Sequence, residues 1–96
     1  MTAPNTAPTV NAGPNETNLT GLFYSESATF SDPDNGPWTY RIDWGDGTSS
    51  TGSTSSQGTI SASHTYLLLG SYTIKVTVTD SLGASGSDTK SVTFIL

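Results

Sequence analysis

The sequence predicts an all-β domain, an antiparallel two-sheet β-sandwich of about seven to nine strands. Apolar and polar residues alternate with period two in several runs, and no apolar pattern of period 3.6 is long enough for a helix. Clusters of Gly, Pro, Asn, Asp and Ser separate these runs, as turns do. Ninety-six residues fit one domain, so all strands must share a single core.

The predicted strands follow one another along the chain. A short opening strand surrounds Val10, and residues 22–30, 39–44, 59–66, 71–80 and 90–96 each keep one apolar face. Residues 49–58 are polar and of low complexity, which indicates a hairpin connection or a weak edge strand. Residues predicted to face the core are Tyr40, Ile42, Trp44, Tyr72, Ile74, Val76 and Val78.

The composition excludes several kinds of function. The formal charge is −5 with only three basic residues, so the basic surface typical of nucleic-acid binding is absent. The absence of cysteine rules out disulfides and thiolate metal sites. No apolar run approaches the length of a membrane span, and we expect no signal peptide.

Two carboxylates, Asp43 and Asp46, bracket the segment Trp44-Gly45 and pose the question of a catalytic or metal-binding pair. Acid–base chemistry would need both carboxyls over one cleft. Asp43, however, alternates outward, and Asp46 lies between Gly45 and Gly47, where an Asp side chain caps a turn and glycine supplies unusual backbone angles. The pattern therefore favours a turn over a catalytic site.

His64 is the only histidine, and no nucleophile motif such as G-x-S-x-G accompanies it. His64 and Tyr66 share the inward face of one strand, so we predict a buried, hydrogen-bonded pair. Tyr66 would tie its strand end to a neighbouring loop in the manner of a tyrosine corner. This interpretation is preferred to catalysis or metal ligation.

Several segments together resemble the PKD (polycystic kidney disease) domain: "YRIDWGDGT" at 40–48, "SHTY" at 63–66, "GSYTIKVTVTD" at 70–80 and "LGASGSD" at 82–88. The likeness extends upstream to "NTAPTVNAGP" and "FSDPDNG" and so covers nearly the whole chain. The positions that match the family motif are Trp44, Gly45, Asp46, Gly47, His64, Tyr66, Gly70, Tyr72 and Asp80. The chain departs from the pattern at Ile42, Glu26 and Leu67–Leu69.

The resemblance implies an immunoglobulin-like sandwich and a non-catalytic structural, spacer and adhesion module within a larger secreted or cell-surface protein. We expect an N-terminal linker over residues 1–7 and a single domain over 8–96. The expected partners are neighbouring domains of the same chain and an extracellular protein or polysaccharide, and the module is expected to be monomeric. The alternative is an accessory carbohydrate- or protein-binding domain beside a secreted hydrolase.

The resemblance also implies a calcium site, although no cofactor is required. Asp32 and Asp34 flank a proline in one turn, and the family likeness places Asp80 near the same end of the sandwich. Asn5 and Thr6 match the segment that supplies further oxygens in calcium-binding bacterial relatives. Because Ca²⁺ prefers several oxygen ligands, these five residues are a candidate cage. The alternative is that the aspartates only cap turns.

Three further features are left open. Trp38 follows a turn, so it either stacks on a sugar ring as an exposed indole or folds over the end of the sandwich. Glu26 lies in an apolar row, so it either turns outward at a bulge or is buried beside Lys90, where it could assist an amide crosslink from Lys90 to an Asn or Asp. Leu67–Leu69 either plug the sandwich or form a contact patch.

Overall fold

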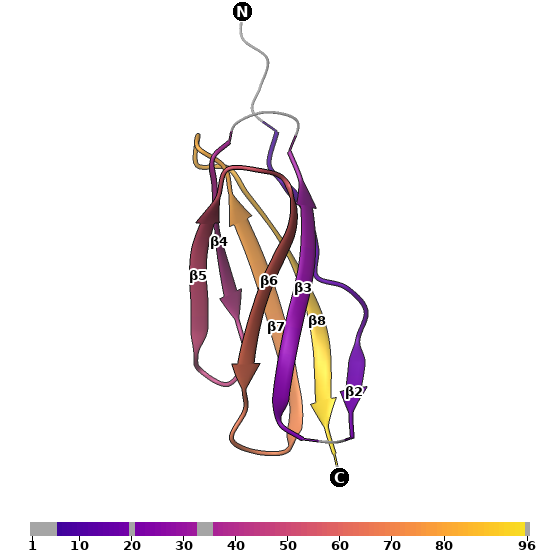
Figure 1. Ribbon diagram of the computed structural model, residues 1–96. Coiled ribbons are helices and arrows are strands. Elements are labelled where there is room, and N and C mark those ends of the chain that lie inside the picture. The colour runs from indigo at the N-terminus through magenta and orange to yellow at the C-terminus, as the bar shows by residue number, and fades with distance from the viewer. Residues whose placement is uncertain (1–5, 20, 33–35, 96) are drawn as a thin grey trace, which may run out of the picture.

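The computed structural model describes residues 6–19, 21–32 and 36–95, which form eight strands and no helix (Figure 1). The strands are β1 (Thr9–Asn11), β2 (Glu16–Asn18), β3 (Phe23–Ser31), β4 (Trp38–Asp43), β5 (Ser49–Thr54), β6 (Gly58–Thr65), β7 (Gly70–Thr79) and β8 (Ser85–Phe94). They build two packed sheets, so the predicted sandwich is confirmed. Among the described residues, no helix could cross a membrane.

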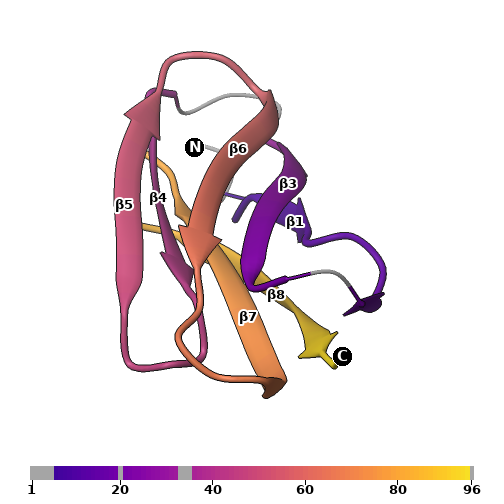
Figure 2. The same ribbon diagram turned by 60° about the horizontal axis from the view of Figure 1, so that its bottom comes forward.

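The smaller sheet has the order β1-β3-β6 and is antiparallel throughout. The larger sheet has the order β2-β8-β7-β4-β5, in which only β2 runs parallel to its neighbour. Figure 2 shows β3 and β6 crossing in front of the larger sheet. Each sheet therefore presents one face to the other and one to solvent, which explains the period-two alternation.

The core lies between the two sheets. Ile42, Ile74, Val76 and Val78 are fully buried, and Trp44 closes the core next to the turn that follows β4. Tyr40 and Tyr72 are only partly buried but pack against this cluster. At about 0.8 kcal/mol per buried CH₂ group, these side chains supply much of the stability of a domain with few apolar residues.

Strand β2 was not predicted. Its three residues, "ETN", show no alternation of apolar and polar residues. β2 is an edge strand, and it is held by parallel pairing of Glu16–Asn18 with Val92–Phe94. Strand β8 begins at Ser85, five residues before the predicted run, since its first half is Ser, Gly and Asp. Residues 49–54 form the edge strand β5, in agreement with one of the two alternatives.

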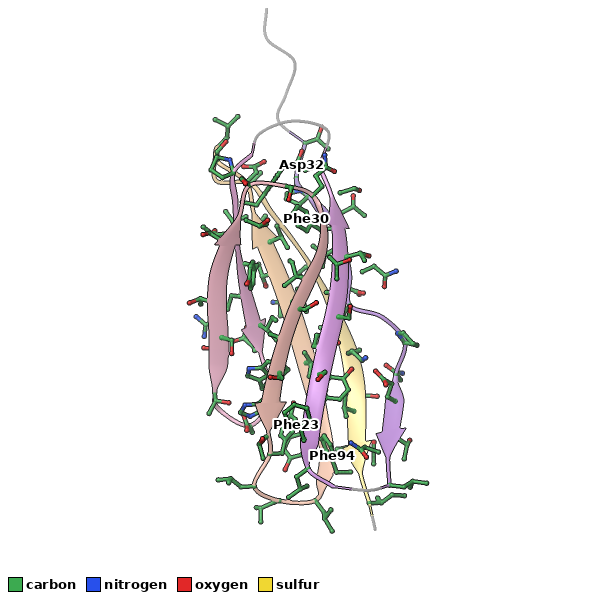
Figure 3. The ribbon with its side chains drawn as sticks, in the orientation of Figure 1. Phe23, Phe30, Asp32 and Phe94 are labelled. Atoms are coloured by element: carbon green, nitrogen blue, oxygen red, sulfur yellow. The ribbon has the colours of Figure 1, made fainter. Side chains whose placement is uncertain are left out.

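The chain enters the sandwich at one end and leaves at the other. Thr9 of β1 pairs with Ser31 at the end of β3, which defines the entry end. Strand β3 begins, β6 ends, β7 begins and β8 ends at the opposite end, which we call the exit end (Figure 1). In Figure 3, Phe30 and Asp32 mark the entry end, and Phe23 and Phe94 mark the exit end.

Candidate functional site

The turn after β4 is built around Asp46. Its Oδ1 accepts hydrogen bonds from the Thr48 amide at 3.1 Å and from the Thr48 hydroxyl, while the Trp44 amide donates to the Thr48 carbonyl at 3.0 Å. Gly45 and Gly47 have φ angles of +87° and +93°, which L side chains rarely adopt. Asp46 thus caps a turn that its two glycines make possible.

Asp43 has a different role from Asp46. Its Oδ1 accepts a hydrogen bond from Arg41 Nε at 2.8 Å, and both side chains are solvent-exposed. An exposed ion pair of this kind contributes at most about 1 kcal/mol. The two carboxylates therefore have separate partners, Arg41 for Asp43 and the atoms of its own turn and His64 for Asp46.

His64 links β6 to this turn. Its ring stacks on Trp44, with centroids 5.0 Å apart and planes within 14°, and its Nε2 lies 2.7 Å from Asp46 Oδ2. The hydrogen bond from Thr48 and next that from His64 lower the pKa of Asp46 to about 2. His64 is partly rather than fully buried, and its polar partner is Asp46 rather than Tyr66.

This grouping has the residue types of a hydrolytic triad but not the geometry. In a triad, one imidazole nitrogen meets the nucleophile and the other meets the carboxylate. Here, Thr48 Oγ1 at 3.3 Å and Asp46 Oδ2 both lie against the same nitrogen, Nε2 of His64. A proton cannot pass through the ring from the hydroxyl to the carboxylate, so the cluster is structural.

Tyr66 behaves as a tyrosine corner. Its buried hydroxyl donates to the Trp44 carbonyl at 2.7 Å, and burial raises its pKa far above the ordinary value. Its ring contacts Tyr72 and Phe94 at 4.3 and 4.9 Å, respectively, between centroids. Gly70, with a φ of +141°, starts β7 just before Tyr72. Tyr66 therefore joins the turn after β4 to the core of the larger sheet.

A buried charged cluster occupies the middle of the sandwich. Glu26 points inward and is 1% exposed, which settles its open orientation in favour of burial. Lys90, also buried, contacts Glu16, Tyr24 and, at 3.5 Å, Glu26 Oε1. Oε2 of Glu26 has no hydrogen-bond partner in the described part of the chain.

Tyr24 and Glu16 complete the charged cluster. The Tyr24 hydroxyl lies 2.6 Å from Glu16 Oε2 and 3.1 Å from Glu26 Oε1, and it can donate to only one of them at a time. Burial and next the bond to Glu16 raise the pKa of Tyr24 well above its ordinary value. Hydrogen bonds from Lys90 and then Tyr24 hold the pKa of Glu16 below its ordinary value.

Among the described residues, no hydrogen bond joins Lys90 Nζ to an Asn or Asp side chain that the hypothesised amide crosslink would need. Within residues 6–19, 21–32 and 36–95, the side-chain groups that Lys90 Nζ contacts are two glutamates and a phenol. The same cluster explains why sequence reasoning missed Glu16, since β2 carries it to Lys90 across 74 residues. A lone glutamate in a polar segment gave no signal for this contact.

Of the two alternatives for Trp38, the structure supports the indole folded over the end of the sandwich rather than an exposed stacking surface. Its side chain is 5% exposed, packs edge-on against Phe30 at 5.3 Å and donates its indole N–H to Asp32 Oδ2 at 3.1 Å. A sugar ring needs a free indole face, and this face is covered by the end of the sandwich. Trp38 therefore does not offer a carbohydrate platform.

The structure describes three of the five residues of the expected calcium cage, Thr6, Asp32 and Asp80. Asn5 and Asp34 lie outside the described residues, and Thr6 is exposed. Asp80 Oδ1 accepts bonds from the Leu82 and Ala84 amides at 2.9 and 3.0 Å, and so caps the β7–β8 turn.

Asp32 is fully buried, and its Oδ1 finds no partner among the described residues. The described residues contain no group of three or more His, Cys, Asp or Glu side chains that could hold a metal. Among the described residues of the proposed cage, Asp32 therefore has a buried carboxylate oxygen that no hydrogen bond satisfies.

Comparison with known proteins gives one family. A model of the PKD domain matches residues 5–95. The PKD domain of an M14-like peptidase from a Thermoplasmatales archaeon is 28% identical with a TM-score of 0.74, and the match covers 94% of each chain. No curated protein matches the chain.

Two bacterial structures are similar to the same extent. The PKD1 domain of Vibrio anguillarum Epp is 29% identical, with a TM-score of 0.71 over 97% of this chain and 99% of that one. The PKD1 domain of the Vibrio cholerae metalloprotease PrtV is 26% identical, with a TM-score of 0.70 over 95% of this chain and 100% of that one.

Proposed function

Because the chain belongs to the PKD domain family, we propose that it is a non-catalytic module that spaces and supports neighbouring domains of an extracellular or cell-surface protein. The similar PKD domains of an M14-like peptidase and of a metalloprotease support a place within a larger polypeptide. In this proposal, any adhesion is carried out by the domains that the module connects.

The observation that carries the proposal is the passage of the chain through a stiff sandwich. Strand β1 starts at the entry end and β8 finishes at the exit end, so flanking segments are held apart by the length of the strands. Tyr66 and Asp46 fasten the turn at the exit end, and Asp80 fastens the turn at the entry end. At the exit end, the geometry at His64 beside Asp46 does not support a catalytic relay.

The experiment replaces residues 8–95 in the parent polypeptide with a flexible Gly/Ser linker of matched mean length. We expect the distance between fluorophores on the two flanking parts to change from a narrow to a broad distribution, because Gly/Ser linkers behave as random coils. An unchanged distribution would count against a spacer. Peptidase or glycosidase activity in the isolated chain would contradict the non-catalytic assignment.

Calcium binding at the entry end is a second candidate function, favoured by the unsatisfied Asp32 Oδ1. A buried carboxylate oxygen without a partner is costly, and it is the type of ligand that Ca²⁺ prefers. Asp32 would supply one oxygen, with Asn5, Thr6, Asp34 and Asp80 as the other proposed ligands. When bound, the ion would neutralise the buried carboxylate of Asp32.

A thermal melt in millimolar Ca²⁺ and in chelator tests the calcium proposal. Binding to the folded state alone raises the melting temperature by mass action, so we expect a shift in wild type that is lost in Asp32→Ala. Asp46→Ala, at the opposite end of the sandwich, is the control and should keep the shift. If wild type melts identically in both buffers, the proposal is wrong.

A further inference from the structure

The exit end of the sandwich carries a cluster of exposed apolar side chains. We name the C-terminal tip the six residues Leu19, Phe23, Leu67, Leu68, Leu69 and Ile95. They come from the β2–β3 connection, the start of β3, the β6–β7 loop and the residue after β8, segments that meet at this end (Figures 1 and 3). About half or more of each side chain is exposed, and Leu67 reaches 88%.

The backbone beneath the tip is fixed, so the tip is a preformed surface. Tyr72 donates its hydroxyl to the Leu68 carbonyl at 2.6 Å, and the Tyr66 amide donates to the Leu22 carbonyl at 2.9 Å. The Ile95 amide donates to the Asn18 carbonyl at 3.1 Å. Beside the leucines lies a hollow of about 300 Å³ lined by Asp46, Thr48, Leu67, Leu68 and Tyr72.

From this arrangement, we propose that the C-terminal tip is the docking surface for the domain that follows strand β8 in the same polypeptide. The proposal rests on the proposed function, because it requires a neighbouring domain. Ile95 belongs to the tip, so any segment that continues the chain emerges through this surface. A tethered domain therefore meets the tip at an effective concentration in the millimolar range.

The size of the tip favours a tethered domain over a second copy of the chain. The sandwich is about 20 × 19 Å in cross-section. The surface area that a contact confined to this end can bury is near the range for interfaces between domains of one chain, about 600–1,500 Å². It is below the range for stable complexes of separate proteins, about 1,200–2,000 Å². A small apolar contact is sufficient only when the partner is already held nearby.

The distribution of charge argues against a membrane as the occupant. Attraction to anionic lipid needs Lys or Arg next to the apolar residues. Arg41 pairs with Asp43 at the end of β4. Asp43 lies opposite Lys75, which is in the middle of β7, and Lys90 is buried. The tip is therefore apolar without a basic rim, as suits a protein surface.

The test uses residues 1–96 extended through the next folded domain of the parent protein, with ¹⁵N relaxation reporting how each domain tumbles. We expect the wild-type pair to tumble as one body. Leu68→Asp should release the module to tumble separately. Leu82→Asp is the matched control, since Leu82 is 69% exposed against 72% for Leu68 and lies at the entry end, and it should change nothing.

Independent tumbling in wild type, continued coupled tumbling in Leu68→Asp, or a parent gene without a domain after residue 96 would each overturn the proposal. Sedimentation and vesicle flotation of the 96-residue chain address the other occupants. Dimerisation or binding to neutral vesicles that Leu68→Asp abolishes would overturn it in favour of a second copy or a membrane. Independent tumbling would leave the spacer role intact, whereas catalytic activity of the isolated chain would remove that role without affecting the tumbling result.

Discussion

Replacing Lys90 with methionine tests whether the buried charged cluster holds the two sheets together. Lys90 Nζ is the cation that faces Glu26 and Glu16, and both Lys90 and Glu26 are almost completely buried. Methionine keeps most of the aliphatic volume and removes the charge. Glu26 would then remain in the core without a cation, and Oε2 already lacks a hydrogen bond in the described residues.

The expected loss is large. Removing one partner of a buried ion pair costs about 3–5 kcal/mol, because the other charge stays buried without compensation. A domain of this size has about 5–15 kcal/mol of stability in all, and 1 kcal/mol corresponds to roughly 4–8 °C. We therefore expect Lys90→Met to lower the melting temperature by at least about 12 °C.

The assays are thermal unfolding and urea unfolding, both followed by the fluorescence of the two buried tryptophans, Trp38 and Trp44. Lys75→Met is the matched control, since Lys75 is exposed on β7 and should change stability by no more than about 0.5 kcal/mol. Adding Glu26→Gln to Lys90→Met should restore part of the loss, with a coupling free energy of about 0.5–3 kcal/mol. If Lys90→Met costs no more than Lys75→Met, the reasoning about the buried charges is wrong.

Three other predictions concern the core, the turn and the response to acid. Ile74→Ala should lower the free energy of unfolding by about 2–4 kcal/mol in urea, because Ile74 is fully buried, whereas Thr73→Ala on the outer face should have little effect. Gly45→Ala should lower the melting temperature of the domain more than Gly47→Ala does. Both glycines have positive φ, but a Cβ at Gly45 would lie 2.5 Å from the Thr73 carbonyl oxygen, whereas a Cβ at Gly47 meets open space. Equal losses in melting temperature would contradict this explanation. Since folding lowers the pKa of Asp46 to about 2 from 3.8, the part of its stabilising contribution that depends on its own ionisation is lost as the pH falls from about 4 through 2. The stability difference between wild type and Asp46→Asn should therefore shrink over that interval.

The local sequence determined the strands and most of the turns. Alternation of apolar and polar residues works for β7 because each of its residues faces either the core or solvent, and pairing with two neighbours does not change that. The turn at Gly45-Asp46-Gly47 was equally readable, because an Asp that caps its own backbone and glycines with positive φ act within a few residues.

Contacts across long stretches of sequence were decided only by the tertiary structure. Strand β2 has no pattern of its own and exists through pairing with β8, which brings Glu16 to Lys90. The orientation of Glu26 depended on whether a cation lies beside it in the core. The residues near Glu26 in the sequence do not indicate whether Lys90 takes that position.

The C-terminal tip and the environment of Trp38 follow the same principle. Three consecutive leucines predict an apolar loop. That Leu19, Phe23 and Ile95 lie at the same end depends on where β2 ends, β3 begins and β8 ends. Trp38 follows a turn in the sequence, yet its side chain is buried at the end of β3. Its ring packs against Phe30, and its indole N–H donates to Asp32. Period and turn chemistry are local properties of the chain, whereas burial and surface clustering depend on the packing of segments distant in sequence.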